Sequence, residues 1–321
     1  MSADPTFALS MAVVAAAACL GVFHMLDVHE KEPAWAVALV TGLGLGGGVG
    51  AARLVEESFQ QRPSGGALTA CATMLLALAA GTAVFAVLGR ERGWSELNGL
   101  MDGIVYGAAA GLGVALGGVF VDELDGTALT ERLTDQTGAY ALVWDSIRST
   151  ISHGLAGALI GAGIGAAFEA RQRRYRWVLP PAGVVVAVVV HYVYLTLATR
   201  TEFFAHELVA LLVPAAIVGV TIWQGLTSER DALRELEGEP ATVVTPQELA
   251  TLRSPATLRR EYMRHFGAGD LETWERSRAL RNRQLQLALT KRSLAGNPRE
   301  EPATEPLRRS IEEIRATLRR T

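Results

Sequence analysis

Apolar residues in this chain are gathered into long runs of the length that crosses a bilayer, roughly 20 residues at about 1.5 Å of rise each. They do not recur at a period of 2 or 3.6, as they would in soluble domains. After residue 227 no run is long enough to span a membrane. About seven runs precede it, at residues 7–26, 34–52, 66–89, 100–121, 149–170, 178–199 and 204–224. The pattern predicts an all-α polytopic membrane helix bundle in residues 1–226.

The rest of the chain, residues 227–321, has the pattern of a small, charged, soluble helical region. Asp270 opens a predicted helix that extends to about Leu294, where a Gly-Asn-Pro triplet ends it. A second helix is predicted over 306–320, with leucine and isoleucine on one stripe. Residues 237–246 are predicted to form a linker or turn. We find no catalytic constellation in this tail and interpret it as an interaction or regulatory module.

Charge and cysteine usage exclude several classes of protein. The tail carries 18 basic and 15 acidic residues, a net charge of +3. The membrane part carries a net charge of −6, so the whole chain has a net charge of −3. Neither part is basic enough to indicate nucleic-acid binding, so the predicted environment is the lipid bilayer. Cys19 and Cys71 both lie inside apolar runs, which argues against a disulfide framework or a cysteine zinc site. No basic residue precedes the first run, so we interpret it as a retained span rather than a signal peptide.

Arginine placement predicts the orientation of the chain in the cell membrane. The densest short basic loop contains Arg171, Arg173, Arg174 and Arg176, and the positive-inside rule places it in the cytoplasm. The tail follows two crossings later and falls on the same side. With seven spans the N-terminus then lies outside, together with the acidic loop 122–135.

Glycines at every fourth position mark the helices that we expect at the centre of the bundle. Small residues at this spacing let helix backbones approach closely, which drives association in lipid. The three series are Gly42, Gly46 and Gly50 in the second span, Gly103, Gly107 and Gly111 in the fourth, and Gly157, Gly161 and Gly165 in the fifth. The string from Gly42 to Gly47 also matches a GxGxxG nucleotide-binding fingerprint, but no strand precedes it, so helix packing is the better interpretation.

Ionisable residues inside spans are costly unless they are paired or face a cavity, so they are candidates for function. Those within the predicted spans are His24, Asp102, His153, Glu169 and His191. Glu169 adjoins the basic loop, and Asp102 stands where it can cap its helix. His153 shares a helical face with Gly157 and Gly161 and should point into the bundle. Two interpretations of the histidines stay open: buried rings bonded to neighbouring polar groups, or metal ligands from adjacent helices.

Four stretches resemble the PrsW family of intramembrane metalloproteases, which is related to the CAAX-type prenyl endopeptidases. They are Glu32-Pro33-Ala-Trp35, then Met101-Asp102-Gly-Ile-Val-Tyr106-Gly107, then His153-Gly-Leu-Ala-Gly157 preceded by Arg148, and finally His191-Tyr-Val-Tyr194. Their order and spacing hold over roughly residues 30–197. The resemblance implies a membrane bundle in which histidines and glutamates hold zinc, and a zinc-activated water attacks a peptide bond of a membrane-anchored protein.

Carried over position by position, that site is incomplete in this chain. The family's Glu-Glu-x-x-Lys motif falls on Ala79-Ala80-Gly-Thr-Ala83, its glutamate late in the fourth span on Gly118, and its last asparagine on Leu195. His153 and His191 remain as the implied metal ligands. A catalytic zinc normally has three protein ligands and a water, and hydrolysis also needs a general base.

Two carboxylates could substitute for the missing groups: Glu57, which with Glu56 ends the second span, and Asp122, one turn beyond Gly118. Our leading hypothesis is a pseudoprotease, a membrane protein of this fold with a degenerate site and a binding or regulatory role. The alternative is an active zinc-dependent endopeptidase that uses Glu57 or Asp122. A third class, a small-molecule transporter, should show inverted repeats or broken helices, and we find no such duplication.

The orientation can be tested by labelling single cysteines with a membrane-impermeant maleimide in intact cells. In a background with Cys19 and Cys71 replaced by alanine, we expect Gly126→Cys to react and Arg174→Cys to react only after permeabilisation, because basic loops are retained in the cytoplasm. Labelling of position 174 in intact cells would refute the assignment.

Overall fold

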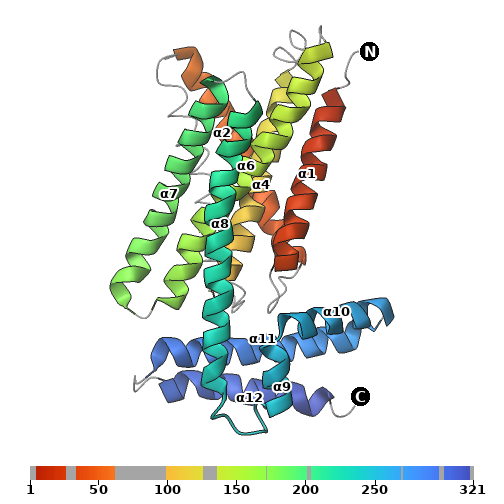
Figure 1. Cartoon of the computed structure of the whole chain (residues 1–321), viewed down its shortest axis with the longest axis vertical. Helices are drawn as coiled ribbons and strands as arrows, with labels where there is room; N and C mark the ends of the chain where they lie inside the picture. The colour runs from red at the N-terminus through yellow and green to blue at the C-terminus, as the bar shows by residue number, and fades with distance from the viewer. Residues whose placement is uncertain are drawn as a thin grey trace. The chain divides into compact units, whose positions relative to one another are not determined.

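A computed structural model describes residues 5–26, 34–61, 99–125, 136–170, 172–200, 204–268, 270–295 and 300–318, and all their regular structure is helical (Figure 1). The long apolar helices are α1 (Pro5–Leu26), α2 (Ala34–Gln61), α4 (Leu100–Asp125), α6 (Gln136–Glu169), α7 (Arg173–Arg200) and α8 (Phe204–Ala232). The helices that follow are η2 (Leu233–Leu236), α9 (Pro246–Leu252), α10 (Pro255–Ala268), α11 (Leu271–Leu294) and α12 (Glu300–Leu318). The predicted all-α membrane bundle is confirmed.

Five of the predicted spans correspond to helices long and apolar enough to cross a membrane. They lie within α2, α4, α6, α7 and α8. The first predicted span is helical as α1, whose described apolar stretch, Leu9–Phe23, is shorter. The third, residues 66–89, lies outside the described residues. The chain divides into two compact units: a membrane unit built mainly from residues up to Ile222, and a C-terminal unit built mainly from the residues from Trp223 on.

The centre of the membrane unit is the contact between α4 and α6. Residues 101–115 of α4 are buried on every side, as expected for a helix that is apolar all round. Gly103, Gly107 and Gly111 face α6, and a Cβ on any of them would lie under 3.0 Å from α6 backbone atoms. Gly157 and Gly161 of α6 meet α4 in the same way. The two predicted glycine faces are therefore confirmed as a backbone-to-backbone contact.

The prediction that the second span packs through Gly42, Gly46 and Gly50 is wrong: a different face of this helix is turned toward its neighbour. A Cβ on Gly42, Gly46 or Gly50 would meet no described atom within 4 Å. Instead α2 packs on α4 through Gly44 and Gly48, whose Cβ positions overlap the backbone at Ala110 and Val114. Glycines occur at nearly every second position of this stretch, so their spacing offers more than one small face. The packing with α4 selects between them.

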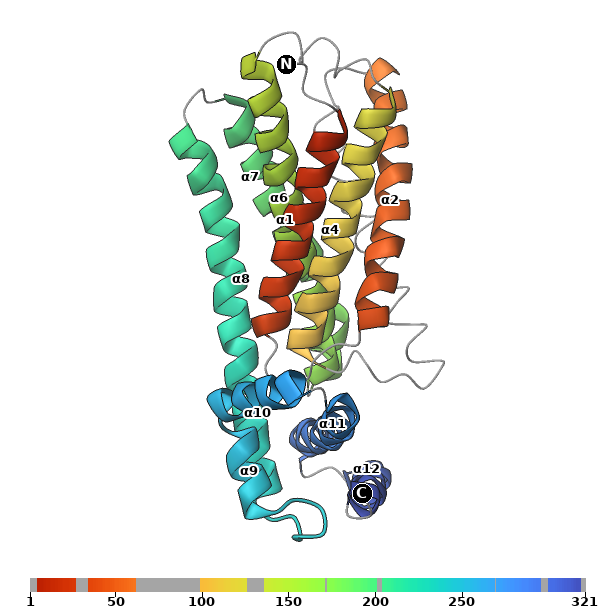
Figure 2. The same cartoon turned by 90° about the vertical axis from the view of Figure 1, so that its right-hand side faces the viewer.

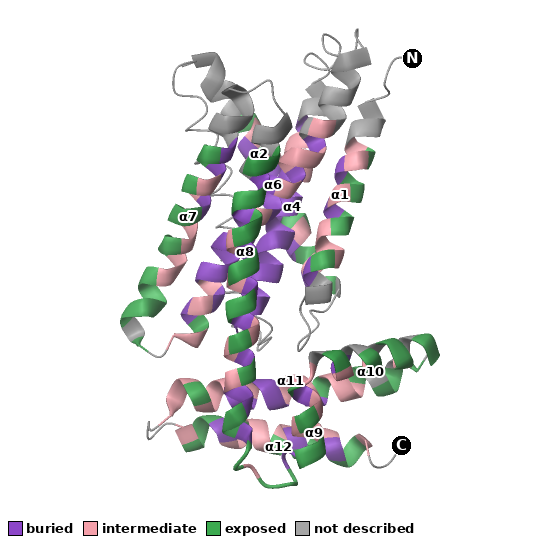
Figure 3. Ribbon diagram, viewed as in Figure 1, coloured by how far each residue is buried: buried purple, intermediate pink, exposed green. Residues whose placement is uncertain are grey.

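Many apolar residues on the outside of the membrane unit are exposed, and Figure 3 colours exposed residues along α7 and α8 green. Trp177, Val185 and Val189 of α7, and Leu212 and Val213 of α8, are exposed. Exposed apolar surface of this extent is unfavourable in water and is the expected surface of helices in lipid.

The C-terminal unit has a hydrophobic core of its own. Residues from five helices contribute, among them Leu233, Leu236, Leu252, Leu287 and Ile311. The helix predicted from Asp270 is confirmed as α11, and the Asp270 side chain accepts a hydrogen bond from the Thr273 amide. The predicted stripe of α12 packs on this core, but α12 begins at Glu300 and contains Pro306, so the predicted start was too late. Pro246 to Leu252 forms α9, capped by a Thr245–Glu248 capping box.

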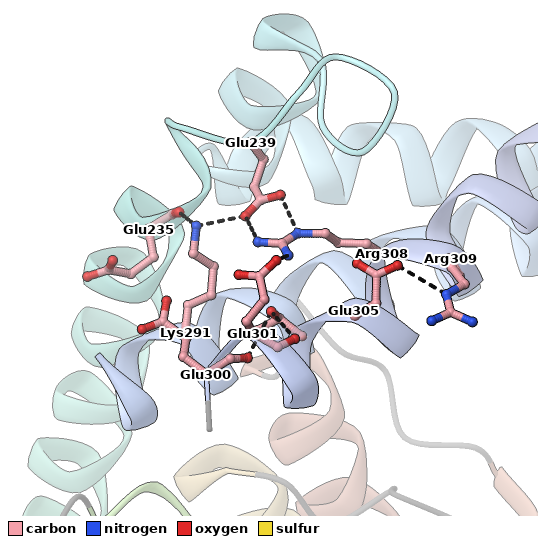
Figure 4. A network of polar contacts seen from close by, with 9 residues as sticks. Glu235, Glu239, Lys291, Glu300, Glu301, Glu305, Arg308 and Arg309 are labelled. Carbon is pink, nitrogen blue, oxygen red and sulfur yellow. Dashed lines mark hydrogen bonds and ion pairs between the residues drawn. The ribbon is translucent and has the colours of Figure 1, made fainter. Parts of the chain in front are cut away.

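Polar groups inside this unit tie α11 and α12 to the turn before α9. Arg315, 8% exposed, donates to the carbonyls of Ala241 and Val243 and to Glu248. The Glu239 carboxylate, with a side chain 2% exposed, accepts from Lys291 at 2.7 Å and from Arg308 at 2.9 and 3.0 Å (Figure 4). These two cations come from α11 and α12, so one buried carboxylate joins three segments of the chain.

Substituting Gly161 tests the central helix contact. Gly161→Leu should lower the free energy of unfolding by about 2 kcal/mol or more, because the side chain would separate α4 from α6. The matched control is Gly46→Leu, whose side chain would meet no described atom within 4 Å of its Cβ. Thermal unfolding in detergent measures both; equal stability of the two variants would contradict the contact.

Glu239 should make the stability of the C-terminal unit depend on pH. Burial raises the pKa of Glu239, but hydrogen bonds from Arg308 and Lys291 outweigh it and hold the pKa below its ordinary value of 4.5. Because its pKa is lower in the folded state than in the unfolded state, ionised Glu239 contributes its full stabilisation of the folded state above pH 4.5. This stabilisation is lost as the pH falls through the pKa that Glu239 has in the folded state.

We therefore expect Glu239→Gln to lower the free energy of unfolding by about 2 kcal/mol at pH 7, because two cations lose their charged acceptor. The difference in stability from wild type should become smaller below pH 4.5. The measurement is thermal unfolding of the full chain by circular dichroism across this pH range. Glu305→Gln, which removes an exposed pair with Arg309, is the control and should change stability by less than about 0.5 kcal/mol. A Glu239→Gln deficit that does not change with pH would contradict the assignment.

Candidate functional site

His153 of α6 and His191 of α7 lie side by side inside the membrane unit. Their ring centroids are 4.8 Å apart, and the ring planes meet at 63°. The side chains are buried, with exposed fractions of 7% and 3%. The close approach expected of the two histidines is therefore confirmed.

Glycine contacts on both sides of α6 set this geometry. The backbone at His153 lies against Gly111 of α4, so α4 fixes the depth and rotation of α6 at this turn. One helical face away, Gly163 of α6 and Gly183 of α7 let those two backbones approach closely. The α6–α7 contact then brings His191 to the level of His153, although 38 positions separate them in sequence.

Each imidazole is oriented by a hydrogen bond at its Nδ1 atom. His153 Nδ1 lies 2.8 Å from the carbonyl oxygen of Ser149, one turn earlier on the same helix. A carbonyl only accepts, so Nδ1 donates, and in the neutral ring the lone pair lies on Nε2. His191 Nδ1 is 3.0 Å from the hydroxyl of Ser152 on α6. An imidazole whose Nδ1 donates, like that of His153, presents Nε2 as a metal ligand. The Ser152 hydroxyl can donate or accept, so its bond orients the ring of His191 without fixing the tautomer.

An aromatic and a cationic side chain adjoin the pair. The Tyr194 ring, one turn beyond His191, has its centroid 5.9 Å from that of His191. The Arg148 guanidinium carbon lies 5.9 Å from the Tyr194 ring centroid, within the range of a cation–π contact. Sequence reasoning missed Ser149 and Ser152 as hydrogen-bond partners. Ser149 precedes His153 by four residues, and this helical spacing could have indicated the Ser149–His153 bond. Nothing in the sequence pointed to the Ser152–His191 bond.

Comparison with known proteins bears on what this site is. A family model described as PrsW family intramembrane metalloprotease matches residues 32–222, more than half of the chain. The chain belongs to the PrsW family. Searches of the curated proteins and of the solved structures return no match.

The other positions of the PrsW site are only partly within the described residues. Gly118 lies in α4 two turns beyond Gly111, where it offers no side chain as a ligand. Ala79 and Ala80 lie outside the described residues, and so do the side chains of Leu195 and of the proposed substitutes Glu57 and Asp122, although helices α7, α2 and α4 include those three residues. The roles of Glu57 and Asp122 stay predictions.

Two other candidate residues have structural roles in this PrsW chain. Asp102, 3% exposed, accepts a hydrogen bond from the amide of Gly99 at 3.1 Å, which caps the start of α4. Glu169 accepts a hydrogen bond from the Ser228 hydroxyl at 3.1 Å. His24 belongs to α1, and its side chain lies outside the described residues.

The zinc that the PrsW family implies fits the described side chains only in part. His153 and His191 supply two imidazoles with suitable orientation. Among the described residues no group of three or more His, Cys, Asp or Glu side chains is placed to hold a metal ion. A catalytic zinc site needs a third protein ligand, and these residues do not provide one.

Proposed function

We propose that this PrsW-family chain is a membrane-embedded binding or regulatory protein in which the protease site is degenerate. The observation that carries the proposal is the buried His153–His191 pair, for which the described residues supply no third side chain placed to hold a metal ion, with Gly118 at the family's glutamate position. The bound partner, by analogy with the substrates that the family implies, is a membrane-anchored protein.

The chemistry of the ligand set supports this interpretation. Zinc-dependent peptide hydrolysis requires three protein ligands, a bound water and a carboxylate or similar base that takes its proton. At Gly118 the family's glutamate is replaced by hydrogen, and at Ala79 and Ala80 the paired glutamates are replaced by methyl groups. Two imidazoles alone bind a divalent metal weakly and leave no base for the water. The buried histidines then act as polar packing groups between α6 and α7, through the Ser152–His191 bond.

One observation favours the alternative, an active zinc-dependent intramembrane endopeptidase. Both rings are held at Nδ1, the arrangement found behind metal-ligating histidines. In that case zinc, when bound, would polarise a water, and Glu57 or Asp122 would supply the third ligand or the base. The two functions differ in how tightly the protein holds zinc.

Zinc content of the purified full chain separates the two functions. We expect well under one zinc per chain, removed by brief chelation, because two imidazoles make an incomplete site. Gly118→Glu restores a carboxylate at the family's position, on the α4 face that packs on α6, and should raise zinc retention about tenfold or more.

His265→Ala is the matched control for adventitious zinc, since His265 lies in the C-terminal unit beside Asp270. One zinc per wild-type chain that resists chelation, unchanged in His265→Ala and lost in both His153→Ala and His191→Ala, would overturn the degenerate site and support the active enzyme.

A further inference from the structure

Helix α10 of the C-terminal unit has a cationic outer face. Arg260, Met263, Arg264 and Gly267 are all exposed and recur at the spacing of a single helical face. Leu258 is buried on the opposite side. Met263, 59% exposed, is the one large apolar side chain so exposed in the described residues after Trp223.

The arginines of this face are not neutralised within the described part of the chain. Neither Arg260 nor Arg264 forms an ion pair with a described residue, whereas the arginines of neighbouring helices do, for example Arg276 with Glu272 and Arg309 with Glu305. The acidic residue of α10, Glu261, is bound to Arg281 of α11 at 2.8 Å. The outer face of α10 therefore presents positive charge around an exposed methionine.

The C-terminal unit begins in the second half of α8. Trp223, 68% exposed, precedes the polar stretch 228–231 of that helix by about one turn, and tryptophan beside such a stretch is typical of the membrane–water interface. α8 continues without a break to Ala232 and passes directly into η2 and the core of the unit. Only about 14 Å of helix separates Trp223 from Ala232.

Within this unit, α10 lies at one edge: Figures 1 and 2 both show α11 between α10 and α12. A short connection to the last span raises the effective concentration of headgroups around this unit, so that even a weak electrostatic attraction is effective.

We propose that α10 is a membrane-surface helix whose arginine face binds the phosphate headgroups of anionic lipids, with Met263 inserted among them. Basic residues beside apolar ones on one helical face are the usual means by which a helix lies in the interface. Each arginine near an anionic surface strengthens binding by about fivefold, so Arg260 and Arg264 together contribute about 25-fold. The contact holds the C-terminal unit on the membrane and is independent of the histidine site.

The test uses the full chain in nanodiscs, with Cys19 and Cys71 replaced by alanine and a polarity-sensitive fluorophore on Met263→Cys. Nanodiscs of phosphatidylcholine alone are compared with nanodiscs that contain about one-third phosphatidylglycerol. We expect a blue shift and at least twofold weaker quenching by aqueous iodide in the anionic nanodiscs. About 1 M salt should reverse both, because it shortens the screening length to about 3 Å.

Two matched variants make the result specific. Arg260→Gln with Arg264→Gln should abolish the lipid-dependent change, and an unchanged circular dichroism melt shows that these exposed substitutions leave the unit folded. A fluorophore on Ala316→Cys, exposed on α12, should not respond to lipid charge.

Equal quenching at position 263 in both nanodiscs would overturn the proposal, and so would an equal response at position 316. If 10 mM inorganic phosphate added to phosphatidylcholine nanodiscs reproduces the change, the face is a site for soluble phosphate and the lipid assignment is wrong.

Discussion

The close approach of α4 and α6 is the constraint on which the rest of the membrane unit depends. Glycines on both helices put backbone against backbone, so that a single methyl group at Gly103, Gly107 or Gly161 would overlap atoms of the other helix. In a bilayer, lipid tails are as apolar as side chains, and burying leucine gains little over leaving it in lipid. Close contact of small residues is then the main source of specific attraction. It fixes the rotation of α6, and with it the direction of His153.

The histidine pair is a product of that packing. His153 comes from the helix that α4 locks in place, and His191 from α7, which packs on α6 through Gly163 and Gly183. Hydrogen bonds to Ser149 and Ser152 then orient the two rings. The PrsW match spans residues 32–222 and includes both histidines. Whether the arrangement does chemistry depends on carboxylates, and Gly118 of α4 carries no side chain that could serve as one.

The C-terminal unit is stabilised by a core of large apolar side chains and by ion pairs, rather than by contacts between glycines. Its core is built from leucine, isoleucine and valine, and its charges are arranged in pairs. The Glu239 carboxylate is buried between Lys291 and Arg308, and three charge-assisted hydrogen bonds offset the cost of that burial. Arg260 and Arg264 of α10 are outside this pattern.

The sequence alone determined the membrane class, most of the helices and the family. Long apolar runs report a bilayer directly, since only a helix satisfies every backbone polar group there. It also pointed to His153 and His191, because ionisable residues inside spans are rare. Tertiary structure decided which face of α2 is buried, Gly44 and Gly48 rather than Gly42 and Gly46, and it joined Ser152 to His191. A periodic pattern describes one helix about its own axis; the rotation and depth at which two helices meet are set by how their surfaces fit, which no single helix encodes.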